Sequence, residues 1–145
     1  MNVTVRTLTG TEFPQAMAIR IQVFVDEQKV PFEEEQDHLD ETAIHFGAFV
    51  DGRMVGTGRL VEQPGRGKIG RMAVLAEGRG QGVGRALLTA ILAECRQRQL
   101  PQAYLSAQLH AIPFYERLGF SVTSGEYMDA GIPHKDMILE LSEKA

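Results

Sequence analysis

Apolar residues recur at helical spacing in the middle of the chain. Between positions 83 and 95 they fall on one face of a helix and comprise Val83, Leu87, Leu88, Ile91, Leu92 and Cys95. Just before them, the apolar run at residues 72–75 has the length of a buried strand. Three glycines lie between the two runs, in residues 79–84, which we call the glycine loop. The pattern therefore predicts a strand, a loop and a helix in succession between Lys68 and Cys95.

The N-terminal part of the chain combines alternating strand patterns with one amphipathic helix. Strands are predicted at residues 3–8, 43–50 and 53–62, the last two joined by a hairpin turn at Asp51-Gly52. Thr11 is expected to cap a helix that runs to about Asp26, with an apolar stripe at Phe13, Met17, Ile21 and Phe24. Pro31 should end any continuation of this helix, and a short helical turn is expected near residues 36–39. The strands at residues 43–50 and 53–62, together with the strand that ends at residue 75, should form three antiparallel strands before the glycine loop.

The pattern in the C-terminal part of the chain predicts strands on either side of one short helix. A break at Leu100-Pro101 leads into a strand at residues 103–108. Pro113 is placed to begin a helix over residues 114–118, which Gly119 would stop. Two final strands are predicted at residues 120–128 and 135–141.

Composition narrows the classes of protein. With 145 residues, 43% of them hydrophobic and 23% charged, the chain is expected to form one globular domain, residues 1–145. It has no signal-peptide core and no run of about 18 apolar residues, so we expect a cytoplasmic protein without a membrane span. The histidines and Cys95 lack metal-ligand spacing, and Cys95 should be an inert buried thiol. A formal net charge of -4 argues against nucleic-acid binding.

Charge is distributed unevenly along the chain. Residues 26–41, which we call the acidic segment, hold eight Asp or Glu residues and a single basic residue, Lys29. Around the glycine loop cations prevail, with only Glu77 opposing Arg66, Lys68, Arg71, Arg79 and Arg85. The first region should attract cations and the second anions. The alternative for the acidic segment is a solvated loop, against which its interleaved apolar residues argue.

The glycine loop has the features of a phosphate site. A helix N-terminus carries unpaired N–H groups and about half a positive charge, and glycines let an anion approach them closely. The expected donors are the backbone groups of Gly80, Gln81, Gly82, Val83 and Gly84, with Arg79 as the charge partner. The alternative is a tight turn between strand and helix without a ligand.

Two motifs in order resemble a known family. Arg79-x-x-Gly82-x-Gly84 opens the helix, and a second segment, Ala111-Ile-Pro-Phe-Tyr-Glu-Arg-Leu-Gly-Phe120, follows it. This pair resembles the GNAT superfamily of acyl-CoA-dependent N-acetyltransferases. Two further segments, Phe24-Val-Asp-Glu-Gln-x-Val-Pro31 and Gly131-Ile-Pro-His134, resemble a bacterial subgroup of it whose substrates are mostly unassigned.

The resemblance implies a fold and a reaction. The fold would be α/β, with a mixed, mainly antiparallel sheet of six to seven strands, helices on both faces and splayed central strands. Acetyl-CoA would be the co-substrate, and its acetyl group would pass by direct attack to a primary amine on a small molecule or peptide. The backbones of Met72, Ala73 and Val74 would pair with the pantetheine arm, and Phe114 would also contact the cofactor. The acidic segment would hold the cationic acceptor, and exposed strand edges near the carboxyl end allow a homodimer.

Tyr115 is the expected general acid. In the family, the tyrosine at this place usually protonates the departing thiolate. A phenol with a pKa of about 10 suits that step, because thiols have pKa values of about 8.5 or higher. The alternative is a packed aromatic side chain beside Phe114 and Phe120.

The general base is harder to assign. Many family members carry an acidic residue on the strand before the glycine loop, but this chain has none between Arg66 and Leu75 and has Arg71 in that neighbourhood. The remaining candidates are His134 and either Glu34 or Glu35. Gln108 also stands where the family commonly has asparagine.

Two other classes of protein stay open. A non-catalytic acyl-CoA-binding or regulatory module would keep the glycine loop and lack an effective base. A nucleotide-binding protein would use the same helix terminus, but the loop lacks the Lys-Ser or Lys-Thr pair and the later ribose-binding acid of such sites.

Overall fold

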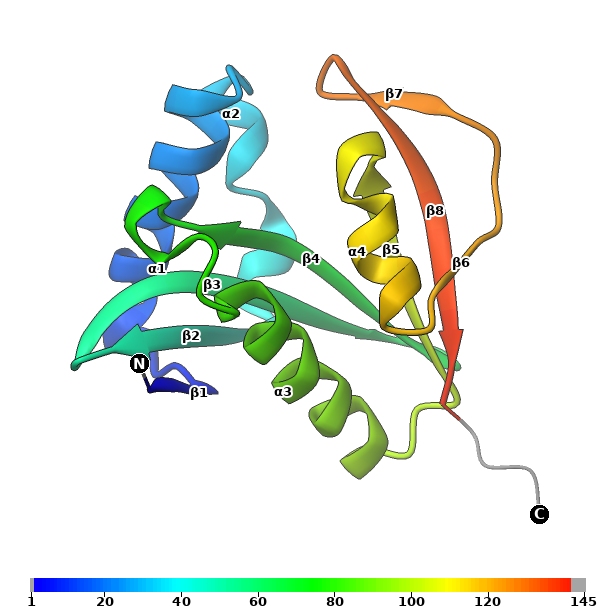
Figure 1. Ribbon diagram of the computed structural model, residues 1–145, viewed down its shortest axis with the longest axis horizontal. Helices are drawn as coiled ribbons and strands as arrows, with labels where there is room; N and C mark the ends of the chain where they lie inside the picture. The colour runs from blue at the N-terminus through cyan, green and yellow to red at the C-terminus, as the bar shows by residue number, and fades with distance from the viewer. Residues whose placement is uncertain (1, 142–145) are drawn as a thin grey trace.

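Eight strands form one sheet in the computed structural model, which describes residues 2–141 (Figure 1). The strand order is β1-β2-β3-β4-β5-β8-β6, and β7 also pairs with β8. The strands are β1 (Val3–Thr7), β2 (Ile44–Val50), β3 (Arg53–Gln63), β4 (Arg66–Val74), β5 (Gln102–Gln108), β6 (Ser121–Val122), β7 (Tyr127–Asp129) and β8 (Ile132–Glu140). All pairings are antiparallel except β4 with β5. The predicted mixed, mainly antiparallel sheet is confirmed, and β1 extends the three predicted antiparallel strands to four.

One predicted strand is divided in two. Residues 120–128 form the short strands β6 and β7 rather than one strand, so the sheet has eight strands instead of six or seven. Between them, the Ser124 hydroxyl accepts the backbone N–H of Asp136 on β8 at 2.9 Å. A side chain thus takes the place of a backbone acceptor, and the ladder is interrupted there.

Helices cover both faces of the sheet. The helical elements are η1 (Gly10–Glu12), α1 (Phe13–Arg20), η2 (Ile21–Glu27), α2 (Phe32–Glu35), η3 (His38–Glu41), η4 (Ala76–Gly78), α3 (Val83–Gln97), η5 (Leu109–Ala111) and α4 (Ile112–Arg117). The first helix begins earlier than predicted, because the N–H of Thr9 donates to the Glu12 carboxylate at 3.0 Å and Thr9 is the cap. It continues to Glu27 as the π-helical η2. The short helical turn expected near residues 36–39 is present as η3, shifted by two residues, and α2 precedes it.

The larger core lies beneath α3. All six apolar residues of its predicted face are buried, including Cys95, whose pKa burial raises to about 11. Glycines on the sheet make room for this helix. A Cβ added at Gly58 would lie 2.9 Å from Ile91 Cδ1, and one at Gly67 would lie 2.9 Å from Cys95 Sγ. A smaller cluster under α1 covers the other face and contains Ile19, Met54 and Ala73, among others.

The sheet opens between its two central strands. β4 and β5 pair over only three positions, Gly67 with Ala103, Lys68 with Tyr104 and Ile69 with Leu105, and then diverge (Figure 1). On its other side β4 has a bulge, because Thr57 pairs with Ala73 and Arg59 with Gly70. Arg71 lies in this bulge with a φ of 50°. The predicted splay beside Val74 is confirmed, and it leaves the β5-facing edge of residues 70–74 without a strand partner.

Residues 2–141 lack two kinds of feature. No helix in this range is both long enough and apolar enough to span a membrane. No group of three or more His, Cys, Asp or Glu side chains in this range is placed to hold a metal ion.

Candidate functional site

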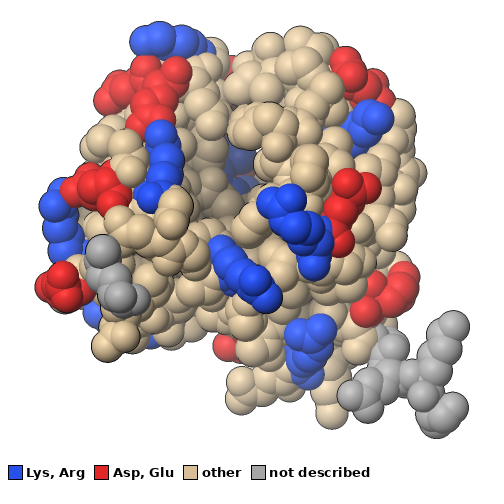
Figure 2. Space-filling model, viewed as in Figure 1, with Lys and Arg blue, Asp and Glu red and all other residues tan. Residues whose placement is uncertain are grey.

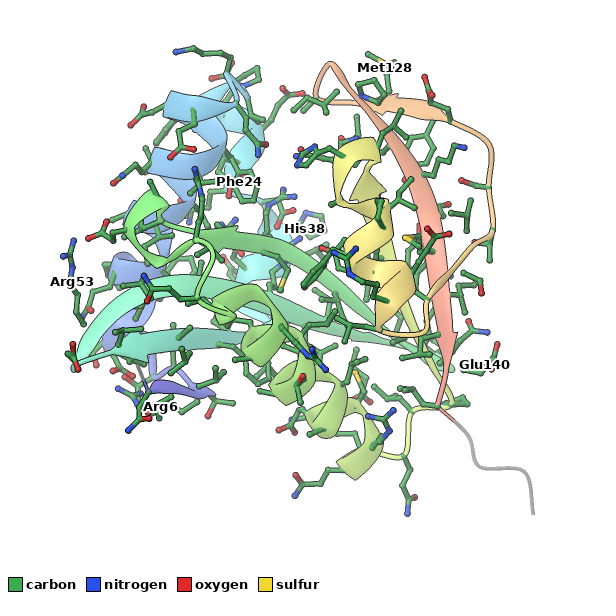
Figure 3. All side chains as sticks on the ribbon, viewed as in Figure 1. Arg6, Phe24, His38, Arg53, Met128 and Glu140 are labelled. Atoms are coloured by element: carbon green, nitrogen blue, oxygen red, sulfur yellow. The ribbon has the colours of Figure 1, made fainter. Side chains whose placement is uncertain are left out.

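A cavity of about 610 Å³ occupies the opening between β4 and β5. Its first wall comes from η2, α2 and η3, its floor from Arg59 and residues 68–72, and its second wall from β5, η5, α4, β7 and β8. Figure 2 shows a hollow between the two sides of the molecule, with Lys or Arg atoms at its bottom. Phe24 lies on the η2 side of the opening and Met128 on the β7 side (Figure 3).

The glycine loop presents unused backbone donors. Gly80 and Gly82 have φ values of 78° and 79°, which a residue with a Cβ rarely adopts. Within residues 2–141, the N–H groups of Gly80, Gln81 and Gly82 donate no hydrogen bond. α3 begins at Val83, so the first N–H groups of this 15-residue helix are also without intrahelical acceptors. These donors and the open space around Gly80 and Gly82 fit a pyrophosphate group.

Arg79 is held between two elements. Its guanidinium forms an ion pair with Glu27 of η2 at 2.6 Å and donates to the backbone oxygen of Val74 at 3.0 Å. It therefore links the first wall to the end of β4 and is already paired.

The other predicted cofactor residues border the same opening. Met72, Ala73 and Val74 lie on the part of β4 whose second edge has no strand partner. Phe114 of α4 packs beside the first turn of α3, where its Cζ lies 3.7 Å from a Cβ placed on Gly84. The glycine loop, the free edge of β4 and α4 thus lie around one end of the opening.

Tyr115 lies at the cavity, and its hydroxyl forms no hydrogen bond with a described residue. It lines the second wall, and its ring packs edge-on against Phe114 and Phe120, with centroids 5.2 and 5.9 Å away. Among the described residues, its hydroxyl has no hydrogen-bond partner. Burial raises the pKa of Tyr115 to about 12, so the phenol keeps its proton at neutral pH. It is both a packed aromatic and an available proton donor.

His134 lies on the same wall with a defined tautomer. It is buried, lines the cavity and stacks on Tyr127, with ring centroids 6.2 Å apart. Its Nδ1 lies 2.7 Å from the backbone oxygen of Ile132. Because a carbonyl oxygen only accepts, Nδ1 must carry the proton. In the neutral ring, Nε2 is then free to accept one.

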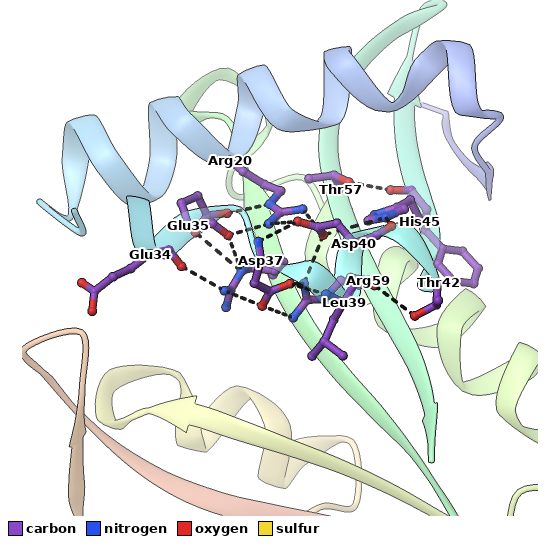
Figure 4. A network of polar contacts seen from close by, with 12 residues as sticks. Arg20, Glu34, Glu35, Asp37, Leu39, Asp40, Thr42, His45, Thr57 and Arg59 are labelled. Carbon is purple, nitrogen blue, oxygen red and sulfur yellow. Dashed lines mark hydrogen bonds and ion pairs between the residues drawn. The ribbon is translucent and has the colours of Figure 1, made fainter. Parts of the chain in front are cut away.

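Much of the acidic segment is folded onto arginines (Figure 4). Arg20 is 1% exposed and donates to Glu35 at 2.6 Å and to Asp40 at 2.8 Å. Arg59 bonds to Asp37 and Asp40, and Arg71 bonds to Asp37. These six side chains, Arg20, Glu35, Asp37, Asp40, Arg59 and Arg71, form what we call the arginine cluster. The expected alternative of a solvated loop is wrong for this part of the segment.

Pairing shapes the protonation of the cluster. Burial by itself would raise the pKa of Asp40, but hydrogen bonds and charge from Arg20 and Arg59 hold it at about 2. Burial raises the pKa of Glu35, although Arg20 opposes that shift. Glu35 is buried and bound to Arg20, a placement that argues against its use as a general base.

Glu34 is separate from the cluster. Its backbone oxygen accepts from Arg71 at 3.3 Å, while its side chain points away from the arginines (Figure 4). The residue is exposed, lines the cavity and forms no ion pair with a described residue. Of the predicted bases, Glu34 and His134 therefore face the cavity from opposite walls.

Several contacts at and beside the cavity were not identified from the sequence. Gln108 Nε2 donates to Gln28 Oε1 at 2.8 Å, which joins the two walls. Ser106 and Tyr127 are hydrogen-bonded through their hydroxyls, and Tyr127 donates to Asp136 at 2.5 Å. Alternation along β5 could have placed Ser106 on the same face as Gln108, but nothing local indicated Gln28 or Asp136 as partners.

Comparison with known proteins points to one family. The family model "Acetyltransferase (GNAT) domain" matches residues 8–141. The uncharacterized N-acetyltransferase YjcF of Bacillus subtilis is 38% identical over 128 residues, which is 88% of this chain and 91% of that protein.

Solved structures agree with this match. An acyl-CoA N-acyltransferase from Pseudomonas aeruginosa has a TM-score of 0.84 and 33% identity, covering 95% of this chain and 98% of the other. A putative N-acetyltransferase from Lactobacillus plantarum has a TM-score of 0.89 and 28% identity, covering 98% of this chain and 100% of the other. The motifs, the splayed sheet and these relatives agree that the chain belongs to the GNAT family of N-acetyltransferases.

Proposed function

We propose that this enzyme transfers an acetyl group from acetyl-CoA to a primary amine of a small molecule or peptide, by direct attack in a ternary complex. The observation that carries the proposal is the opening between β4 and β5: Tyr115 and His134 line its cavity, and Phe114, the neighbour of Tyr115, packs beside the glycine loop with its free N–H donors. We place the reaction in the cytoplasm. The single domain over residues 1–145 and the homodimer stay predictions.

The cofactor would be held mainly by backbone groups. The N–H groups of Gly80, Gln81, Gly82, Val83 and Gly84 would bind the pyrophosphate, and the free edge of Met72, Ala73 and Val74 would pair with the pantetheine arm. Phe114 would pack beside it. Arg79 would add positive charge at the phosphates only if its contact with Glu27 opened.

The chain's own residues would then move two protons. Acetyl-CoA supplies the thioester, whose carbonyl carbon the neutral amine attacks. The amine would lose a proton to His134 Nε2, or to the Glu34 carboxylate on the opposite wall. As the carbon–sulfur bond breaks, Tyr115 would donate its proton to the departing thiolate. A cationic amine would be drawn to the cavity by Glu34 and by its exposed neighbour Glu33.

The relatives favour an enzyme over a non-catalytic acyl-CoA-binding module, because they are named as N-acetyltransferases. A thiol-release assay with acetyl-CoA and a panel of primary amines separates the two functions. We expect release of CoA that depends on the amine. Binding of acetyl-CoA without CoA release in the presence of any of the amines would support the binding module.

Replacing Gly82 tests the cofactor site. Gly82→Val should weaken acetyl-CoA binding by at least about tenfold, because a β-branched residue does not hold the φ of 79° that shapes the loop. Calorimetry measures the affinity. Gly10→Val is the matched control, since Gly10 also has open space around its Cβ position but no positive φ. Unchanged affinity in Gly82→Val would remove the glycine loop from the cofactor site.

A further inference from the structure

Lys68 differs from the other cations of the cavity. Three basic side chains line the floor, namely Arg59, Lys68 and Arg71. Both arginines belong to the arginine cluster and are bound to carboxylates. Lys68 forms no ion pair with any residue from 2 to 141. Its Nζ lies over the Tyr104 ring in a cation–π contact, 6.0 Å from the ring centroid. The residue is half-buried. The floor of the cavity therefore holds a partly buried ammonium group that has no acidic partner among the described residues.

Such a group favours an anion in the cavity. A cation that is partly withdrawn from water loses part of its hydration, and the carboxylate of a ligand would compensate for this loss. The cavity also has carboxylates that form no ion pair within the described part of the chain, from Glu33 and Glu34 on the first wall and Asp129 on the second. All three residues are exposed, in contrast to Lys68. The cavity thus combines negative charge in its exposed parts with one positive charge on its floor.

The strand register sets the separation between these regions. Lys68 on β4 pairs with Tyr104 on β5, and His134 on β8 pairs with Gln108, which is also on β5. Tyr104 and Gln108 are four residues apart, which is about 13 Å along a strand. The long side chain of Lys68 can shorten this span only in part. A ligand with its amine near His134 and its anion near Lys68 therefore needs several bonds between the two groups.

We propose that the acceptor is an amino carboxylate in which several methylene groups separate the amine from the carboxylate, and that Lys68 binds the carboxylate. The proposal rests on the acetyl-transfer function proposed above. It makes Lys68 a specificity-determining residue and assigns it no role in the chemical step. A terminal side-chain amine on a molecule with a free carboxylate fits this description, whereas in a short α-amino acid the two groups lie too close together.

The test compares acceptors that differ only in charge at the far end. Acetylation of 6-aminohexanoate and of 6-aminohexanamide is followed by thiol release. In the wild-type enzyme, the KM for the acid should be about tenfold lower, which corresponds to ~1.4 kcal/mol. Lys68→Met should bring the two KM values to the same level, and Lys68→Glu should favour 1,6-diaminohexane over both. Circular dichroism melting confirms that each variant is folded.

Arg66 provides the matched control. It stacks on the same Tyr104 ring at 4.1 Å but does not line the cavity. Arg66→Met should keep the tenfold preference for the acid. Equal KM values in the wild type, or a preference that survives Lys68→Met, would overturn the role of Lys68 even if all the amines are acetylated.

Binding is measured in parallel so that the outcome does not depend on turnover. Calorimetry with CoA present compares the affinities of the acid and the amide. If no amine is acetylated, the acetyl-transfer proposal fails, yet a Lys68-dependent preference in binding would still support the carboxylate subsite. Equal affinity for both ligands, or binding of neither, would contradict it.

Discussion

The two walls of the cavity hold their polar groups in different ways. On the first wall, Glu35, Asp37 and Asp40 are fixed by ionic contacts to arginines. On the second wall, the Tyr115 hydroxyl and one ring nitrogen of His134 have no hydrogen-bond partner among residues 2–141. Three of the carboxylates on the first wall are thus tied to arginines, and Glu33 and Glu34 are the ones that keep a free carboxylate among the described residues. A count of acidic residues near a site therefore says little about its capacity for acid–base chemistry.

Burial is the physical reason for this difference. The side chains of Glu35 and Asp40 are only 3% exposed. A charged group that is buried so deeply destabilises the folded state unless an opposite charge pairs with it. Arg20 supplies that charge from the end of α1, so the cluster attaches the acidic segment to the sheet. The second wall is held by ring packing and by hydrogen bonds rather than by buried ion pairs, and this leaves individual atoms available to a ligand.

Removing Arg20 should break the first wall and gives the largest expected effect. Arg20→Ala leaves two buried carboxylates without their main partner, which should lower the free energy of unfolding by about 3–5 kcal/mol. Urea denaturation measures the loss. Arg98→Ala is the control, because Arg98 also contacts two carboxylates but is largely exposed, and its loss should be about 1 kcal/mol or less. Similar losses for both variants would mean that the cluster is no more than a surface network.

Tyr115→Phe tests the chemistry of the second wall. The variant keeps the ring packing and loses the hydroxyl, so turnover should fall by on the order of a hundredfold while acetyl-CoA affinity stays within about twofold. Steady-state kinetics and calorimetry separate the two quantities.

Tyr127→Phe is the comparison for that experiment. The Tyr127 hydroxyl is already bound to Ser106 and Asp136, so its removal should reduce turnover far less than the loss of the Tyr115 hydroxyl. If turnover of Tyr115→Phe were close to that of the wild type, Tyr115 would be a packing residue.

The bridge between the walls should have the smallest effect. Gln108→Ala removes the hydrogen bond to Gln28 and should lower the free energy of unfolding by about 1 kcal/mol. Gln102→Ala, on the same strand, removes an exposed bond to Glu140 and should cost less. A double-mutant cycle with Gln28→Ala isolates the coupling between the two glutamines. A coupling energy near zero would show that the walls are held independently.

Signals within a single element were sufficient for much of the fold. The apolar face of α3, its glycine loop and the Pro113 start of α4 could be read from the sequence, because they depend on residues only a few positions apart. The resemblance to the GNAT family then indicated the splay beside Val74 and the placement of Tyr115. Errors at this level were local, as at the Thr9 cap, where Thr9 and Thr11 look alike in sequence.

Only the tertiary structure decided how the charged residues are used. Arg20 meets Glu35 and Asp40 from 15 and 20 positions away, and Gln28 meets Gln108 across 80. The bulge that places Arg71 against Asp37 depends on the register between β3 and β4. Whether a charge is paired or free depends on what folding brings near it and on how far water is excluded. For this reason the sequence determined the glycine loop and the fold, while the folded arrangement decided that Lys68, Glu34 and His134 are among the cavity groups left without an ionic partner in residues 2–141.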